Sequence, residues 1–326
     1  FIVPMSLLGD RFTYELRKSL IRMTKFLSID AFPQKDDPKD RVFIDAKLPT
    51  CIYILQNATP NGNFLVRTHP GKEIAVNSPN YLATPDEINV FDPNSLSIPT
   101  VSQSDWKLIL FLLSNPKLCF LKDVATSSPG EIMFNKQFKK YLSDAPPGEI
   151  VLRGAHIGRY EFQEIPKQGS PVYLNKKLYL LERSNESSKA HAHKKIRIGY
   201  QRGSAIDNYR RIIATMLPTE VFCSDTVGYF SESEYNLFTL LALLNSSIAE
   251  WRFRLTSSTN HVNPYELDVI PIPIFNLTAS SNKQTLSRTF QSLYKQDDYP
   301  AILTQVAAEL AANRNDTIHD LLAYLA

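Results

Sequence analysis

Three clusters of basic, aromatic and small polar residues contain the side-chain types that contact nucleic acid. Arg and His can reach base edges or phosphates, and glycine lets a backbone approach a ligand closely. The clusters are LRGAHIGRYEF at residues 152–162, GYQRGSAIDNYRR at residues 199–211 and TSSTNH at residues 256–261. Their candidate DNA-binding residues are Arg153, His156, Arg159, Tyr160, Tyr200, Arg202, Asn208, Tyr209, Arg210, Arg211, Ser257, Ser258, Asn260 and His261. The competing interpretation is that these segments are ordinary turns and a solvated helix.

The distribution of charge favours the nucleic-acid interpretation. The chain of 326 residues has a formal net charge of +3. Between Glu131 and Arg211 lie 16 of its 36 Lys/Arg residues and 8 of its 33 Asp/Glu residues, so this segment carries +8 and the remainder −5. A basic segment within an otherwise slightly acidic chain is expected of a module that binds a polyanion. A solvated lysine-rich surface would have the same composition, and that alternative stays open.

Two short motifs could hold a metal ion, and both are incomplete. His191 and His193 lack carboxylate or cysteine support, so we expect an exposed loop and no metal there. Pro85-Asp86 followed by Asp105-Trp106-Lys107 matches the loose PD…(D/E)xK spacing of metal-dependent nucleases. Asp105 also has the position of a helix cap, so a nuclease site is kept only as an alternative.

No complete catalytic centre is present in the sequence. Asn263-Pro264-Tyr265 matches part of an N/D-P-P-Y/F amine-methylation motif, but it lacks the second proline and a preceding strand. The chain has no GxGxxG run, no P-loop lysine and no serine nucleophile elbow. Chemistry, if the protein performs any, therefore needs residues beyond these.

Two phenylalanines flank a charged loop that should be solvated. Residues 32–56 read FPQKDDPKDRVFIDAKLPTCIYILQ, a polar loop that ends in an apolar run typical of a β-strand. An exposed ring on such a loop is available for stacking, which makes Phe32 and Phe43 candidates. The alternative for each is a core position, Phe32 at the end of a short strand and Phe43 under a hairpin.

The elements that position these residues can be outlined from hydrophobic periodicity. Residues 9–23 predict an amphipathic helix. Its inward residues would be Leu16, Leu20 and Ile21, and its outward residues Arg17, Lys18 and Arg22. Strands at residues 48–55 and 64–68 predict a hairpin across an Asn-Gly turn. Residues 231–255 predict one long helix, because Ser231 and Glu234 have capping-box spacing.

Composition limits the class of protein. Cys51, Cys119 and Cys223 have neither metal nor redox spacing, so we interpret them as reduced core thiols of a cytoplasmic protein. No apolar run of about 18 residues is present, so no transmembrane helix is expected. Between residues 71 and 100 the composition shifts to Pro, Asn, Ser and Asp, which indicates a domain boundary.

Four segments in order resemble a known family. FIVPMSLLGDRFTYELRKSLI resembles the segment after the catalytic N-P-P-Y motif of TaqI-like, gamma-ordered DNA adenine methyltransferases, and DRVFIDAKLPTCIYIL resembles a later motif of that catalytic domain. LRGAHIGRYEF and LLALLNSSIAEWRFRLTSSTNHVNPYELDVIPIP resemble elements of the TaqI-like specificity domain. The segment FPQKDDPKDRVF is similar to sequences of the restriction–modification branch of this family, which includes type IIG enzymes.

The resemblance implies an α/β and α+β architecture. Residues 1–75 would be the tail end of a Rossmann-like methyltransferase sheet, residues 76–275 a mixed α+β target-recognition domain, and residues 276–326 a helical tail. It further implies double-stranded DNA as the partner and S-adenosyl-L-methionine as the cofactor, bound by an upstream catalytic domain of the same chain. Mg²⁺ is implied only if a nuclease domain also lies upstream. The glycine-rich cofactor motif and the N-P-P-Y motif are expected before Phe1.

The family also implies an aromatic ring that stacks on a flipped adenine. Alignment of the FPQK text places it at Phe32, whereas alignment backward from the following strand places it at Phe43. We favour Phe43, because the strand fixes where the end of the loop points.

Three functions remain open at this stage. They are recognition of duplex DNA within an adenine-N6 methyltransferase, a DNA-specificity subunit without catalysis, and the endonuclease portion of a fused restriction–methylation enzyme.

Overall fold

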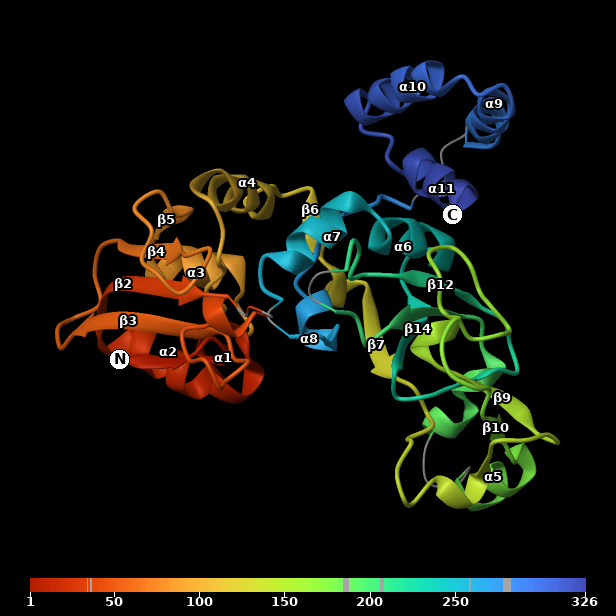
Figure 1. The fold of residues 1–326 in the computed structure, drawn as a ribbon. Helices are drawn as coiled ribbons and strands as arrows, with labels where there is room; N and C mark the ends of the chain where they lie inside the picture. Colours follow the sequence, from red (N-terminus) through yellow and green to blue (C-terminus); the bar gives the residue numbers. More distant parts are fainter. Residues whose placement is uncertain (34, 36, 184–187, 206–207, 258, 278–282) are drawn as a thin grey trace. The chain divides into compact units, whose positions relative to one another are not determined.

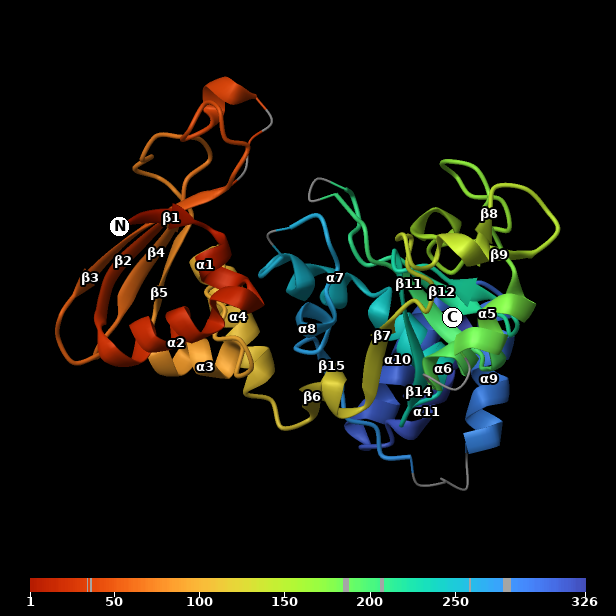
Figure 2. The same ribbon diagram turned by 90° about the horizontal axis from the view of Figure 1, so that it is seen from below.

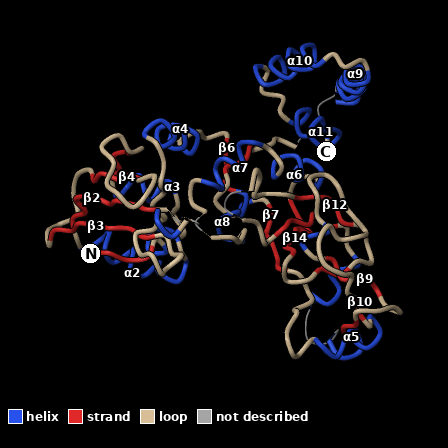
Figure 3. Tube along the Cα trace, viewed as in Figure 1, coloured by secondary structure: helices blue, strands red, loops and turns tan. Residues whose placement is uncertain are grey.

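The computed structural model describes residues 1–33, 35, 37–183, 188–205, 208–257, 259–277 and 283–326. Helices and several sheets alternate along the chain, which confirms a mixed α/β class (Figures 1 and 3). Two compact units result: one joins Phe1–Leu118 to Trp251–Thr259, and the other joins Cys119–Glu250 to Asn260–Ala326. The division into residues 1–75, 76–275 and 276–326 stays a prediction, because it rests on composition and family resemblance rather than on compactness.

The first unit contains a five-stranded sheet in the order β1-β3-β2-β4-β5, with helices α2 and α3 along one face (Figure 2). Its elements are β1 (Ile2–Pro4), α1 (Ser6–Gly9), η1 (Arg11–Thr13), α2 (Tyr14–Met23), β2 (Lys25–Phe32), η2 (Pro38–Asp40), β3 (Thr50–Gln56), β4 (Phe64–Thr68), β5 (Asn80–Ala83), α3 (Pro85–Phe91) and α4 (Gln103–Leu113). The expected hairpin between β3 and β4 is wrong. Strand β3 pairs with β1 and β2 on its two edges, so β4 pairs instead with β2, in parallel, and with β5.

Helix α2 buries a residue that the sequence places outside. Ile21 is buried as expected, but Leu16 is exposed and Arg17 is buried. The Arg17 guanidinium donates to the carbonyl oxygens of Leu7 at 2.7 Å and Ser95 at 2.5 Å. Periodicity missed this because a guanidinium can be buried where several carbonyl oxygens satisfy its donors.

The second unit contains two four-stranded sheets, in the orders β12-β11-β14-β7 and β13-β9-β10-β8. Its elements up to residue 244 are η3 (Leu121–Asp123), β7 (Ala125–Pro129), η4 (Lys139–Tyr141), β8 (Leu142–Ser143), β9 (Glu149–Leu152), η5 (Gly154–His156), β10 (Tyr173–Leu174), α5 (Lys176–Arg183), η6 (Ser188–Lys194), β11 (Arg197–Gln201), β12 (Ala214–Leu217), β13 (Phe222–Cys223), β14 (Val227–Ser233) and α6 (Leu237–Leu244). Strand β11 is the centre of the first of these sheets and presents four buried residues in succession.

The long helix expected at residues 231–255 is two helices. Ser231 belongs to β14, and α6 begins after Asn236, whose side chain accepts a hydrogen bond from the backbone N–H of Phe238. Helix α6 ends at Asn245, and α7 (Ser247–Arg254) follows. The side chain of Asn245 is fully buried and exchanges hydrogen bonds with the backbone of Ala214. That pairing with a neighbouring strand stops the helix where periodicity would continue it.

The remaining elements complete the chain. They are β6 (Leu118–Phe120), α8 (Pro264–Leu267), β15 (Pro271–Pro273), α9 (Lys283–Lys295), α10 (Tyr299–Ala311) and α11 (Asp316–Leu325). Helix α11 packs on α6, where the hydroxyl of Thr239 donates to the carbonyl oxygen of His319. Among the described residues, no helix is long and apolar enough to cross a membrane.

Candidate nucleic-acid interface

The motif LRGAHIGRYEF forms a tight hairpin with two residues at its tip. Ile157 bridges Phe162 in antiparallel fashion, and the N–H of Gly158 donates to the carbonyl oxygen of Glu161 at 2.8 Å. A Cβ on Gly158 would lie 3.0 Å from that oxygen, so a side chain at this position would crowd the turn. The tip therefore presents Arg159 and Tyr160 to solvent.

The conformation of the tip is specific. Tyr160 has φ 60°, which is uncommon for a residue with a side chain. The N–H of Tyr160 donates to the carbonyl oxygen of Ala214 at 2.9 Å, which holds this backbone in place. The Arg159 guanidinium lies over the Tyr160 ring, 5.3 Å from its centroid. Unusual backbone conformations held by their surroundings are enriched at functional sites, so the tip is a candidate for ligand contact.

A second segment meets the hairpin at the end of helix α6. Arg210 donates to the carbonyl oxygen of Asn245 at 2.8 Å, and Arg159 donates to the same oxygen at 3.1 Å. Neighbouring Tyr209 is almost fully exposed. Two residues from different sequence clusters, Arg159 and Arg210, are thus brought together by the free carbonyl groups of a helix C-terminus, which attract cations.

Two positive charges lie close together in this arrangement, and the charge of Glu250 partly offsets that of Arg210. In the described part of the chain, neither Arg159 nor Arg210 has a carboxylate within ion-pair distance. Partial burial, and then the nearby charge of Arg159, lower the pKa of Arg210 from its usual value. Two like charges held side by side favour the approach of an anion, because an anion relieves their repulsion. We define Arg159, Tyr160, Tyr209 and Arg210 as the arginine–tyrosine cluster.

The second and third sequence clusters also meet. Gly203 bridges His261 in antiparallel fashion, and the N–H of Ser204 donates to the carbonyl oxygen of Asn260 at 2.9 Å. Asn208, Asn260 and His261 are exposed. The Asn208 amide donates to the Ser204 hydroxyl at 3.2 Å. Asn208 directly precedes Tyr209 of the arginine–tyrosine cluster in the sequence, and the side chains of all three residues are of types that can donate to phosphates.

Several candidate residues have structural partners instead. Tyr200 is buried, its hydroxyl donates to Ser127, and a Cβ on Gly228 would lie 2.1 Å from the ring. Burial raises the pKa of Tyr200 to about 12. Arg211 is also buried, and its backbone N–H donates to the carboxylate of Glu250. A buried side chain has no face to offer to DNA, so neither residue is placed for direct readout.

Three more candidates hold loops in place. His156 is fully buried and its Nδ1 accepts from the backbone N–H of Arg153 at 2.9 Å, while burial lowers the pKa of this imidazole. The Arg153 guanidinium donates to the carbonyl oxygen of Ser170 at 2.6 Å. Arg202 donates to the carbonyl oxygen of Asp225 at 2.9 Å. These half-buried or buried groups fix the loops that carry the exposed ones.

The third cluster lies partly outside these contacts. Ser257 belongs to the first unit, and its backbone N–H donates to the carbonyl oxygen of Phe253 at 3.1 Å. Ser258 lies outside the described residues.

The two candidate stacking phenylalanines have opposite environments. Phe32 is the last residue of β2, is only 4% exposed, and stacks on His69 at 4.8 Å between ring centroids. Phe43 lies in the loop before β3 and is 50% exposed. One face of Phe32 is therefore already covered, whereas Phe43 has free ring surface. Its role against a base stays a prediction.

The weaker motifs have ordinary structural positions. Asp86 and Asp105 both lie in first turns of helices, α3 and α4, and Asp105 accepts hydrogen bonds from Ser102 and from the Trp251 indole. The exposed loop expected around His191 and His193 is wrong at His193, which is buried and stacks on Phe222 at 4.4 Å between ring centroids. Within the described ranges, no group of three or more His, Cys, Asp or Glu residues could hold a metal ion.

Comparison with known proteins gives distant structural likenesses. No family model and no curated protein matches the chain. Similar solved structures include BpuSI, a type IIG restriction endonuclease (TM-score 0.37, 12% identity, 87% of this chain and 41% of that chain), and MmeI, a type IIL restriction-modification enzyme in complex with DNA (TM-score 0.46, 10% identity, 92% and 42%). A structure from a type I R-M system has a TM-score of 0.33 and 11% identity, and the match covers 99% of this chain and 96% of that chain.

These likenesses assign no role to any residue. The chain spans less than half the length of the BpuSI and MmeI chains that it matches. At identities of 10–12%, individual side chains of this chain cannot be matched to those of the similar structures. The candidate interface therefore rests on its own geometry.

Sequence reasoning missed the residue that assembles the interface. The side chain of Asn245 accepts a hydrogen bond from the backbone of Ala214 in β12. Its backbone carbonyl oxygen accepts hydrogen bonds from the guanidinium groups of Arg159 and Arg210. The available signal was the LLNSS run, in which Asn and Ser interrupt an apolar helix and favour a cap.

Proposed function

We propose that this chain recognises duplex DNA as part of an S-adenosyl-L-methionine-dependent adenine-N6 DNA methyltransferase of a restriction–modification system. The observation that carries the DNA-binding part is the arginine–tyrosine cluster, in which two guanidinium groups converge without a carboxylate partner among the described residues. The whole reaction belongs to the longer protein that the sequence resemblance implies.

The shape of the hairpin supports contact with a DNA groove. The major groove admits a two-stranded β-ribbon. The hairpin around Arg159 and Tyr160 is a smaller antiparallel turn, held by one β-bridge and ending in a two-residue tip. Arginine is the side chain that most often reads guanine, through O6 and N7. Arg210, which is half-buried, is suited to a phosphate, because such contacts fix the register of the protein on DNA.

The catalytic part of the proposal concerns the first unit. Phe43 would form one wall of the pocket that receives an adenine flipped from the duplex. The methyl donor would be held by upstream residues that contain the N-P-P-Y motif, and Mg²⁺ would be needed only by an upstream nuclease domain. The half-exposed ring of Phe43 supports this assignment over the covered ring of Phe32.

The first experiment selects duplexes that bind the chain from a random library. A shared enriched sequence is expected, because base contacts discriminate by about 1–3 kcal/mol each. Arg159→Ala should then weaken binding to the enriched duplex more than to a scrambled one. The control is Arg22→Ala, which removes an exposed arginine from α2 in the other unit.

The outcomes separate the possible functions. Equal loss on both duplexes would make Arg159 a phosphate contact, and no enrichment would contradict sequence-specific recognition. Methyl transfer to adenine by the full-length protein would distinguish an enzyme from a specificity subunit. Cleavage abolished by Asp86→Ala would favour the nuclease alternative.

A further inference from the structure

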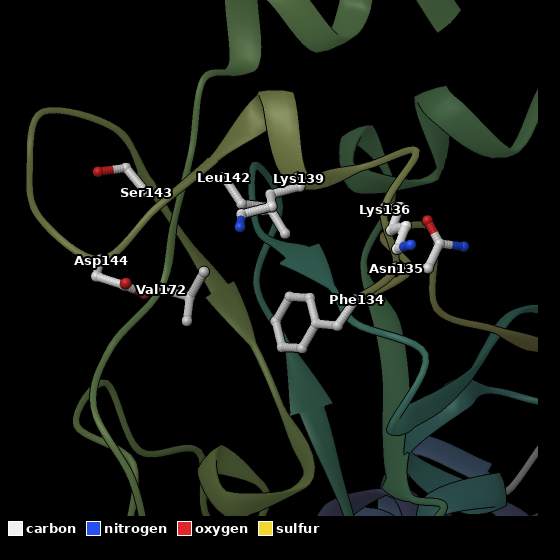
Figure 4. A pocket seen from close by; sticks show the side chains of 8 residues that line it. All are labelled: Phe134, Asn135, Lys136, Lys139, Leu142, Ser143, Asp144 and Val172. Atoms are coloured by element: carbon white, nitrogen blue, oxygen red, sulfur yellow. The ribbon is translucent and has the colours of Figure 1, made fainter.

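A second open site lies in the same unit, away from the residues of the arginine–tyrosine cluster. It is a groove of about 630 Å³ lined by Phe134, Asn135, Lys136, Lys139, Leu142, Ser143, Asp144 and Val172 (Figure 4). This volume falls within the roughly 300–1,000 Å³ typical of small-ligand sites. We define these residues as the lysine groove.

The groove has firmly held walls. The Asn135 side-chain oxygen accepts from the backbone N–H groups of Gln137 at 3.0 Å and Phe138 at 3.2 Å, which fixes the turn that carries Lys136 and Lys139. On the other side, Leu142 pairs with Leu174 in the sheet and packs on a buried apolar cluster. The Ser143 hydroxyl closes a local turn by donating to Ala145 at 2.7 Å. The groove is therefore formed before any ligand arrives.

The lysines of the groove differ from three other lysines of this unit. Lys140, Lys176 and Lys195 each form an ion pair, with Glu182, Glu220 and Glu232 respectively. Lys136 and Lys139 have no ion-pair partner in the described ranges. Two ammonium groups beside an open groove favour an anionic ligand.

The aromatic ring stands between opposite charges. Phe134 is 40% exposed and lies in the middle of the groove, with Lys136 at one end and Asp144 at the other (Figure 4). Every nucleobase has a flat face that stacks on such a ring. A carboxylate can accept a hydrogen bond from an exocyclic amino group, as acidic residues do from cytosine N4.

We propose that the lysine groove binds a nucleoside 5′-phosphate unit whose base carries an exocyclic amino group. The base stacks on Phe134, the phosphate lies between Lys136 and Lys139, and Asp144 accepts from the amino group. The unit can come from a free nucleotide or from an unpaired nucleotide of a DNA strand. In the second case the inference rests on the proposed DNA-binding function.

The test titrates the full chain with dCMP, dTMP and inorganic phosphate by calorimetry. dCMP is expected to bind at least about tenfold more tightly than phosphate, because stacking adds to the charge attraction. Phe134→Ala should remove that difference and Phe134→Tyr should retain it. Equal affinity for dCMP and phosphate would overturn the proposal.

Two further variants test the polar contacts. Lys136→Gln combined with Lys139→Gln should weaken dCMP binding and flatten its salt dependence. The matched control is Lys177→Gln, an exposed lysine on α5 that does not line the groove. Asp144→Asn should remove the preference for dCMP over dTMP. Unchanged binding by the double lysine variant would place the phosphate elsewhere and contradict the site.

The source of the nucleotide is separated with labelled oligonucleotides. An oligonucleotide of four dC residues is compared with dCMP. If it binds more tightly than dCMP, and Phe134→Ala removes this difference in affinity, the natural ligand is a DNA strand. A dCMP affinity that no strand exceeds indicates a free nucleotide. The selected duplex, measured in parallel with Arg159→Ala, reports the proposed function separately, so failure of one site leaves the other measurable.

Discussion

Two sets of arginines in the second unit have the same chemistry and opposite surroundings. Arg197 is fully buried, forms an ion pair with Glu131 at 3.1 Å, and lies 4.7 Å from the centroid of the Tyr229 ring. Arg159 and Arg210 are more open, and among the described residues they have carbonyl oxygens but no carboxylate as partners. Burial demands a compensating charge, whereas an exposed guanidinium can be left for a ligand.

The Glu131 carboxylate, the partner of Arg197, is likewise subject to opposing effects of burial and ion pairing. Burial raises the pKa of Glu131, and the attraction of Arg197 opposes that effect. The Glu131–Arg197 pair therefore contributes to stability, whereas the role that we propose for Arg159 and Arg210 is binding. The tests that follow ask whether this separation holds.

The largest effect is expected for Glu131→Ala. Removal of this carboxylate leaves the Arg197 guanidinium buried and uncompensated, which costs about 3–5 kcal/mol of unfolding free energy. Chemical denaturation measures the loss, with Glu149→Ala, at the exposed first residue of β9, as the control. A loss below about 1 kcal/mol would show that Arg197 does not depend on its carboxylate.

The phenylalanines extend the comparison to the first unit. Phe32→Ala should lower the unfolding free energy by about 3 kcal/mol, because it empties a packed site against His69. Phe43→Ala should change stability by about 0.5 kcal/mol or less. Under the proposed function, only Phe43→Ala should weaken binding to DNA with an extrahelical adenine, by about 1–3 kcal/mol. Loss confined to Phe32→Ala would reverse the assignment.

Smaller changes are expected from the exposed arginines. Arg210→Ala should reduce the slope of duplex affinity against salt by about one unit and leave the unfolding free energy within about 0.5 kcal/mol. Fluorescence anisotropy across a salt series measures the slope, and Arg22→Ala is the control. An unchanged slope, or a large loss of unfolding free energy, would show that Arg210 stabilises the fold, as Arg197 does, rather than contacting DNA.

The smallest effect concerns pH and the interactions of Asp30 with Arg67 and His69. Asp30 accepts from Arg67 at 2.6 Å and from His69 at 2.8 Å. Burial acts to raise the pKa of Asp30, but these partners outweigh it and hold the value below 3.8. Asp30 therefore stabilises the fold above about pH 3.8, and that contribution is lost as pH falls through the lower, folded value.

Asp30→Asn should remove this part of the acid sensitivity. Denaturation midpoints between pH 7 and pH 2 measure it, and Asp45→Asn in an exposed loop is the control. Equal acid sensitivity in the wild type and in Asp30→Asn would show that the Asp30 interactions contribute little.

Local patterns predicted the elements better than their pairing. The apolar runs of β3 and β4 were located within two residues of their actual ends, because β-type residues and turn residues are local signals. The pairing of β3 and β4 was not predicted, because β2, which comes earlier in the chain, lies between them and pairs with both. The break at Asn245 was missed for the same reason: its cause is a hydrogen bond to Ala214, 31 residues away.

Residue types and charge alone determined that this chain carries a basic segment rich in Arg, Tyr and His around two glycine turns. Only the tertiary structure decided which of those residues can touch a ligand. Arg211 and Arg210 are adjacent in sequence, yet Arg211 is buried beside Glu250 and Arg210 reaches the end of α6. The reason is physical: burial and ion pairing depend on distant segments, which a local pattern does not contain.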